Sequence, residues 1–257
     1  MPAAYAHLRF GREQRLPGAY AALPKNFPQL YDLGLQGPDL FFYYTPLFHT
    51  ATGALGHNLH QLSGREFFER ALASYRKAPS DGARAYLFGL LGHYCLDSRC
   101  HKFIYEVTAQ GNPGHTELET EFDRALQQLD GKVLPQDRRI SQYLRLTKGE
   151  RATVAAFYPD VSPAAIGWCV GNMARIYRLC ASKHRRTARL LLSLGGKNGL
   201  GLLPTVGPNR NCVHLNDPLL KLYQKAAECY PELARQLIAA LEDNTPLGEE
   251  FAPSFNK

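Results

Sequence analysis

The chain has 257 residues, 45% of them hydrophobic and 21% charged, which is the balance of a globular protein with a sizeable core. No apolar run reaches the roughly 18–20 residues that a membrane-spanning helix needs, so we expect no transmembrane segment. The formal net charge of +7 favours an anionic partner such as a phosphate ester, a nucleic acid or a lipid headgroup, although a solvated basic surface carries the same charge.

The N-terminal sequence and the cysteines indicate the cellular compartment. The first residues, M-P-A-A-Y-A-H-L-R-F-G-R-E, include polar and charged side chains too early for the apolar region of a signal peptide. The six cysteines form no C-x-x-C pair, so reduced thiols are expected at Cys95, Cys100, Cys169, Cys180, Cys212 and Cys229. We therefore expect a cytoplasmic protein.

Helical periodicity dominates the first half of the chain. A Gly- and Pro-punctuated loop is expected over residues 34–39, and Asp81 is expected to cap the helix that follows Pro79. Apolar residues at helical spacing predict helices over residues 3–16, 26–33, 52–77, 81–107 and 115–129.

The second half continues the helical pattern. Ser162 and Pro163 form a typical helix start, and the helix behind them is expected to continue with little interruption to residue 194. Residues 195–207 are expected to form a loop, and Asp217-Pro218 to start a last helix that Pro231 kinks or splits. No segment alternates like a strand, so we expect an all-α fold, a single multi-helix domain over residues 1–257 with roughly eight to ten helices.

Residues 93–119 carry a pattern of potential metal ligands. His93, Asp97 and His101 are four residues apart, and His115 and Glu119 repeat this spacing on the next predicted helix. Residues four apart share one face of a helix, and imidazole and carboxylate are both good zinc ligands. A single histidine on an apolar face is usually a hydrogen-bonded core residue, but an isolated buried carboxylate such as Asp97 is costly unless it is paired or binds a metal. The combination therefore predicts a metal site.

These motifs resemble those of the zinc-dependent phospholipase C family. The similarity lies in H-Y-C-L-D-x-x-x-H, followed after a Gly/Pro loop by G-H-x-x-x-E, and extends upstream to M-P-A-A-Y-A-H, G-L-Q-G-P-D and L-G-H-N-L-H. It covers about the first 125 residues. The resemblance implies the all-α fold that this family shares with zinc-dependent single-strand nucleases.

The resemblance also implies three zinc ions and their ligands. Asp39 is expected as a further ligand of the first ion or as the general base, and the chain's amine, at Met1 or Pro2, as a ligand of the second. His57 lies one turn from His60 and could replace it, although the sequence context favours His60. The implied sets are His60, His93 and Asp97 for the first ion, Asp97 as a bridge to His7 for the second, and His101, His115 and Glu119 for the third.

The expected function is a phospholipase C-like hydrolase that cleaves a phosphodiester with a zinc-bridging hydroxide, assisted by Asp39. The alternatives are a single-strand nuclease at the same site and a non-catalytic, zinc-stabilised helical protein that binds an anionic partner. The aromatic residues 41–44 could hold a quaternary ammonium headgroup or a nucleobase, but core packing is the simpler role. The basic residues 138–139 and 183–186 could contact phosphates, or form solvated helix faces.

Overall fold

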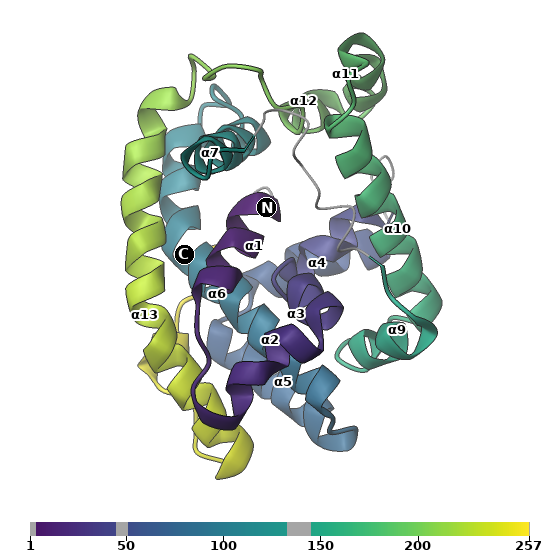
Figure 1. Ribbon diagram of the computed structural model, residues 1–257, viewed down its shortest axis with the longest axis vertical. Coiled ribbons are helices and arrows are strands. Elements are labelled where there is room, and N and C mark those ends of the chain that lie inside the picture. Colours follow the sequence, from purple (N-terminus) through teal and green to yellow (C-terminus); the bar gives the residue numbers. More distant parts are fainter. Residues whose placement is uncertain (1–3, 45–50, 133–144, 257) are drawn as a thin grey trace.

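The computed structural model describes residues 4–44, 51–132 and 145–256, and these residues form helices and connecting loops without a β-strand (Figure 1). The fold is therefore all-α, as the sequence predicts. The main helices are α1 (Ala4–Glu13), α3 (Pro28–Gly34), α4 (Ala51–Gln61), α5 (Gly64–Lys77), α6 (Asp81–Thr108), α7 (His115–Leu129), α9 (Lys148–Ala155), α10 (Pro163–Cys180), α11 (Arg185–Ser193) and α13 (Asn216–Glu242). Shorter segments are α2 (Leu23–Asn26), α12 (Gly196–Gly201) and the 3-10 helices η1 (Gly18–Ala22), η2 (Gly37–Tyr43), η3 (Val213–Leu215) and η4 (Glu249–Phe251).

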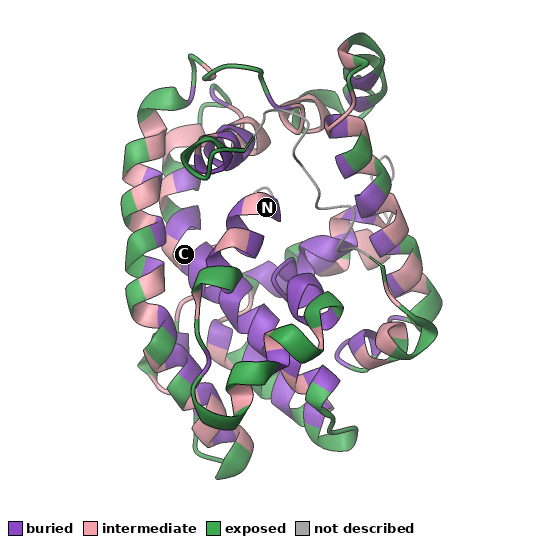
Figure 2. Ribbon diagram, in the orientation of Figure 1, coloured by how far each residue is buried: buried purple, intermediate pink, exposed green. Residues whose placement is uncertain are grey.

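Helix α6 lies at the centre of the molecule, and most of its surface is buried (Figure 2). Its sequence is apolar on nearly all sides, which is typical of a helix covered by neighbours in every direction. Helices α3 and α13 pack against it most extensively. The contact with α3 is close because two glycines face each other: a Cβ atom on Gly89 would lie 2.8 Å from the Cα atom of Gly34. Glycines at this crossing let the two backbones approach and hold η2 close to α6.

The helix boundaries correct several sequence-based expectations. The Ser80 side chain accepts a hydrogen bond from the Ala83 amide, so Ser80 rather than Asp81 is the N-cap of α6. Helix α4 is separate from α5, because Ser63 caps the latter. The predicted loop over residues 34–39 contains the start of η2, and the predicted loop over residues 195–207 contains α12.

Two long helices also differ from expectation. The helix that begins after Ser162 ends at Cys180, and α11 follows as a separate element instead of continuing to residue 194. Helix α13 begins at Asn216 and includes Pro231 without splitting. Together with the short segments, this division makes the described helices more numerous than the sequence predicts.

Candidate metal centre

The predicted ligands on α6 lie along one buried face of that helix. His93, Asp97 and His101 are all fully buried at the centre of the molecule. A fully buried carboxylate has a large desolvation cost unless other charges or ligands compensate it. The environment of Asp97 therefore decides what this part of the molecule can do.

Asp97 lies among four histidines that come from three helices. Its Oδ1 atom is 3.2 Å from Nε2 of His7 on α1, whereas its Oδ2 atom is 3.1 Å from Nε2 of His93. Oδ2 is also 3.6 Å from Nε2 of His60 on α4 and 3.4 Å from Nδ1 of His101. The two oxygens of one carboxylate therefore face different histidines.

Asp39 joins this cluster from η2. Its Oδ1 atom is 3.1 Å from Nε2 of His60, and both side chains are buried. One potential ligand atom from each of Asp39, His60 and His93 lies within 4.8 Å of the others, and the same holds for His7, His93 and Asp97. His93 belongs to both groups, so the two groups form one continuous cluster.

A further cluster joins the end of α6 to the start of α7. Nε2 of His115 is 2.8 Å from Oε1 of Glu119, and Nε2 of His101 is 3.4 Å from the same oxygen. These three residues also offer ligand atoms within 4.8 Å of one another. The i, i+4 pair on α7 therefore faces the last turn of the ladder on α6, as the spacing predicts.

Backbone carbonyls orient three of the imidazole rings. The Nδ1 atoms of His60, His93 and His101 donate hydrogen bonds to the carbonyl oxygens of Gly56 (2.6 Å), Leu35 (3.2 Å) and Phe255 (3.0 Å), respectively. A ring that donates from Nδ1 carries its remaining lone pair on Nε2, which is the arrangement of a metal-binding histidine. In each ring, Nε2 points toward a carboxylate of the clusters.

The electrostatics of the cluster keep the carboxylate ionised. Burial alone would raise the pKa of Asp97, but the charges of His101, His93 and His7 and the neighbouring imidazole of His60 hold this pKa well below its usual range. Burial would lower the pKa of His60, yet the neighbouring carboxylates of Asp39 and Asp97 raise it to about 9. Burial lowers the pKa of His93. The cluster thus combines anionic oxygens with nitrogens of differing basicity.

Gly37 makes room for the His93 ring. Its φ angle is +55°, which favours glycine, and a Cβ atom at this position would lie 2.3 Å from Cδ2 of His93. We expect Gly37→Ala to lower the free energy of unfolding of the chelator-treated protein by about 2 kcal/mol, since it adds backbone strain and a clash. In protein purified without chelator, the same substitution should lower the zinc content. Urea denaturation and elemental analysis would measure the two effects.

Gly18→Ala is a matched control for this substitution. Gly18 has nearly the same φ angle, +54°, but nothing lies within 4 Å of the position of its Cβ. The Gly18→Ala variant should lose about 1 kcal/mol of unfolding free energy and keep its zinc. Equal zinc loss in both variants would contradict the conclusion that the lack of a side chain at Gly37 makes room for the His93 ring.

Sequence reasoning missed two residues that position the ligands. Asp123 on α7 accepts hydrogen bonds from the amides of Tyr5 (2.9 Å) and Ala6 (2.8 Å), which fixes the first turn of α1 beside His7. Asp123 lies four residues beyond Glu119, so extending the spacing by one step could have found it. Phe255 offers its carbonyl to His101, and its ring lies 5.4 Å from that of His60. No sequence signal connects Phe255 to the histidines.

The structure thus brings all eight predicted site residues into these clusters, and other expected features fall elsewhere. His57 is exposed, whereas His60 is buried in the cluster. The amine of Met1 or Pro2 and the basic residues 138–139 lie outside the described residues.

In the aromatic run, Phe41 and Tyr43 are buried in the core, and half-buried Phe42 stacks on His60 with ring centroids 5.8 Å apart. All six cysteines are free thiols.

Comparison with known proteins agrees with this geometry. The sequence matches the zinc dependent phospholipase C family over residues 5–177, which is more than half of the chain and contains all eight clustered residues. No curated protein and no solved structure gives a significant match. None of the described helices has the length and apolarity needed to cross a bilayer. By its sequence and by the helical scaffold that carries these clusters, the chain belongs to the zinc-dependent phospholipase C family.

Proposed function

We propose that the protein is a phosphodiester hydrolase of the phospholipase C type with three zinc sites. The observation that carries this proposal is the position of Asp97, whose Oδ1 faces His7 and whose Oδ2 faces His93 and His60. A carboxylate with this arrangement suits a bridge between two metal ions, which is the arrangement that two-metal phosphoesterases use.

The donor atoms fit zinc. Buried atoms without a hydrogen bond include Nε2 of His7, His60 and His93 and both carboxylate oxygens of Asp97. Native proteins rarely leave so many buried polar atoms without hydrogen bonds, and a bound cation would satisfy them together. Imidazole nitrogens and carboxylate oxygens are typical zinc ligands, and the carbonyl bonds to Nδ1 provide the outer support that such histidines require.

The clustered residues divide into three proposed ligand sets, two of which share Asp97. The third set is separate from the other two and includes His115, which is the most accessible of its members. We assign His60, His93 and Asp97 to the first ion, with Asp39 beside His60 as the proton acceptor, Asp97 and His7 to the second ion, and His101, His115 and Glu119 to the third.

Bound zinc would supply positive charge against the phosphodiester oxygens and would make water more acidic. The protein contributes orientation and a proton acceptor. Asp39 accepts one proton from the attacking water as the water oxygen forms the new bond to phosphorus. The bond from phosphorus to the alcohol oxygen then breaks, and the proton held by Asp39 passes to that oxygen, which leaves as the alcohol. His60, 3.1 Å from Asp39, holds that carboxylate in place. Phe42, stacked on His60, forms an apolar edge beside this pair.

Zinc content and substrate cleavage would test the proposal together. We expect close to three zinc ions per chain by elemental analysis of untagged protein purified without chelator. The same preparation should cleave a phosphocholine ester and phosphatidylcholine and leave single-stranded DNA intact. Asp39→Asn should abolish cleavage, whereas Asp32→Asn, a buried carboxylate paired with Arg12 outside the clusters, should retain it.

The opposite outcomes identify the other functions. Cleavage of single-stranded DNA without cleavage of the phosphocholine ester would show a nuclease. Zinc binding without turnover of any phosphodiester would show a zinc-stabilised binding protein. Zinc content near zero would contradict the proposed site itself.

A further inference from the structure

Helix α11 lies at one corner of the molecule (Figure 1). Leucines on this helix and at its C-cap are exposed. The exposed fractions are 69% for Leu190, 48% for Leu191 and 67% for Leu194, and Val206 in the segment after α12 is 71% exposed. Single exposed apolar residues are ordinary, but several large ones on one side of a helix, as the three leucines are, mark an interaction surface. This region lies beyond residues 5–177, the part that matches the family.

Cationic residues adjoin the leucines on the same helix. Successive helical residues are about 100° apart, so Leu190, Leu191 and Leu194 fall within a sector of about 100°. By the same geometry Arg186 and Arg189 occupy the adjoining sector. The buried residues Ala188 and Leu192 attach the opposite side of α11 to the protein. The exposed side of α11 is therefore part apolar and part cationic.

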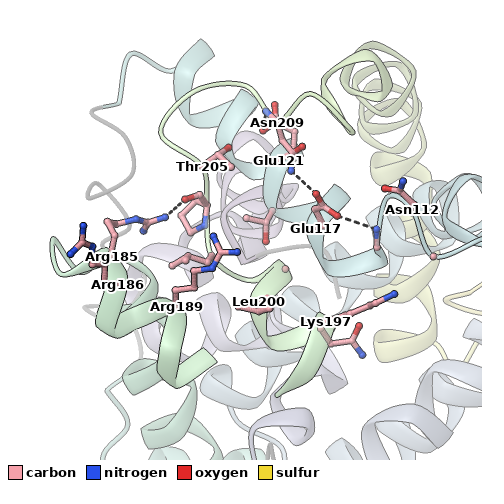
Figure 3. Close-up of a pocket in the computed structure, with 17 residues that line it drawn as sticks. Asn112, Glu117, Glu121, Arg185, Arg186, Arg189, Lys197, Leu200, Thr205 and Asn209 are labelled. Atoms are coloured by element: carbon pink, nitrogen blue, oxygen red, sulfur yellow. Dashed lines mark hydrogen bonds between the residues drawn. The ribbon is translucent and has the colours of Figure 1, made fainter. Parts of the chain in front are cut away.

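A pocket of about 830 Å³ lies between α11, α12 and α7 (Figure 3). Arg185, Arg186 and Arg189 line it from α11, and Lys197 lines it from α12. Arg186, Arg189 and Lys197 make no hydrogen bond or ion pair within the described part of the chain. Their charges are thus available to an anion.

The carboxylates of this pocket are already engaged by other groups. Glu121 makes a bidentate pair with Arg124, with both N–O distances 2.8 Å. Glu117 accepts a hydrogen bond of 2.8 Å from the side chain of Asn209 (Figure 3). Among the described lining residues, Glu117 and Glu121 are the only acidic ones. The three free cations therefore lack a carboxylate partner, which favours an external anion.

We propose that α11, α12 and the segment around Val206 form a docking surface for an anionic lipid bilayer. The inserted leucines would lie at the boundary of the acyl chains, while Arg186, Arg189 and Lys197 contact lipid phosphates, one of which enters the pocket. A helix with one cationic and one apolar side binds membranes in this way. The leucines favour a bilayer over a nucleic acid, which would contact the cations but leave the leucines in water.

This inference rests on the proposed function, because it supplies the surface that brings the enzyme to a phospholipid. Helix α7 connects the two sites: Glu117 and Glu121 on one face line the pocket, and His115 and Glu119 on the other belong to the third metal set. The His115 side chain is 22% exposed, whereas that of Glu119 is 1% exposed. Helix α7 thus links the proposed docking surface to the accessible end of the metal centre.

Vesicle co-sedimentation of the full chain would test the surface. Zinc-loaded protein with Asp39→Asn is used, so that binding is measured without hydrolysis of the vesicles. We expect binding to equimolar phosphatidylglycerol and phosphatidylcholine, much weaker binding to phosphatidylcholine alone, and a decrease as salt rises. In this background Arg186→Gln with Arg189→Gln should weaken binding about 25-fold, at about fivefold per cation. Leu190→Ser with Leu194→Ser should weaken it at least about tenfold.

Matched variants elsewhere on the surface provide the controls. Lys221→Gln with Lys225→Gln removes the same charge from exposed positions of α13, and Leu129→Ser removes a leucine that is 66% exposed. Both should bind vesicles like the parent protein. No binding to anionic vesicles, or equal loss in the controls, would overturn the docking surface. Loss with the arginine pair but not the leucine pair, together with arginine-dependent binding of single-stranded DNA, would assign the surface to a nucleic acid instead.

The binding measurement is independent of turnover. Vesicle binding by a protein that cleaves no phosphodiester would leave the docking surface standing and reject the proposed function. Cleavage of a soluble phosphocholine ester by a protein that does not bind vesicles would support the proposed function and reject the docking surface.

Discussion

Asp97→Asn is expected to remove most of the activity and at least one zinc ion per chain. The substitution keeps the size of the side chain but replaces an anionic oxygen, which faces either His7 or the pair of His93 and His60, with an amide NH₂ group that cannot bind a metal. We expect the rate of phosphodiester cleavage to fall by at least about a thousandfold, which corresponds to about 4 kcal/mol of transition-state stabilisation. Elemental analysis and steady-state kinetics would measure both losses.

The control for this substitution is Asp32→Asn. Asp32 is also buried, but it pairs with Arg12 at 2.8 Å and belongs to none of the clusters. Its variant should lose stability through the broken ion pair and keep both zinc and activity. Full zinc content and normal cleavage in Asp97→Asn would show that this carboxylate only pairs with the surrounding histidines.

Removal of zinc is expected to lower the melting temperature by at least about 8 °C. A ligand at a thousand times its dissociation constant stabilises the folded state by about 4 kcal/mol, and a chain of this length shifts by roughly 2–4 °C per kcal/mol. The buried ligand atoms that make no hydrogen bond within the protein, such as both oxygens of Asp97 and Nε2 of His7, would lose their bound partner when the metal is removed. Circular dichroism melts with and without a chelator would measure the shift.

Adding metal ions back to the chelator-treated protein separates the effect of zinc from a general effect of salt. Excess zinc should restore the melting temperature, and excess magnesium should not, because magnesium prefers oxygen ligands and the clusters are rich in imidazole. Asp97→Asn should respond much less to the chelator than the parent protein. A melting temperature that is insensitive to the chelator would mean that the folded protein does not depend on bound metal.

The sequence predicts the local part of the site better than its assembly. His93, Asp97 and His101 follow from the helical period alone, as do His115 and Glu119, because i, i+4 neighbours are fixed by helix geometry. His7, His60 and Asp39 come from α1, α4 and η2, and no period links these elements to α6. Only the family resemblance indicated that they belong together, and the structure brings them within contact distance of Asp97 or His93.

The errors in the predicted fold have physical causes as well. The predicted helix from Ser162 to residue 194 ends at Cys180 because of tertiary packing and the turn before α11, which apolar periodicity does not report. Gly195, Gly196 and Gly199 suggested a loop, yet α12 forms there and packs on α7. Phe255 contributes through its backbone carbonyl. Every residue type has this carbonyl, so the sequence holds no signal for this role.

The contact between Phe255 and His101 has a consequence for the order of folding. His7 lies about ninety residues before Asp97 in the chain. The Phe255 carbonyl that orients His101 lies 154 residues after His101. Such long-range contacts form late, because closing large loops costs entropy before the contacts are gained. We therefore expect the His101 ring to reach its final orientation only after Phe255 has been synthesised and packed, so that full metal loading would follow synthesis of the chain.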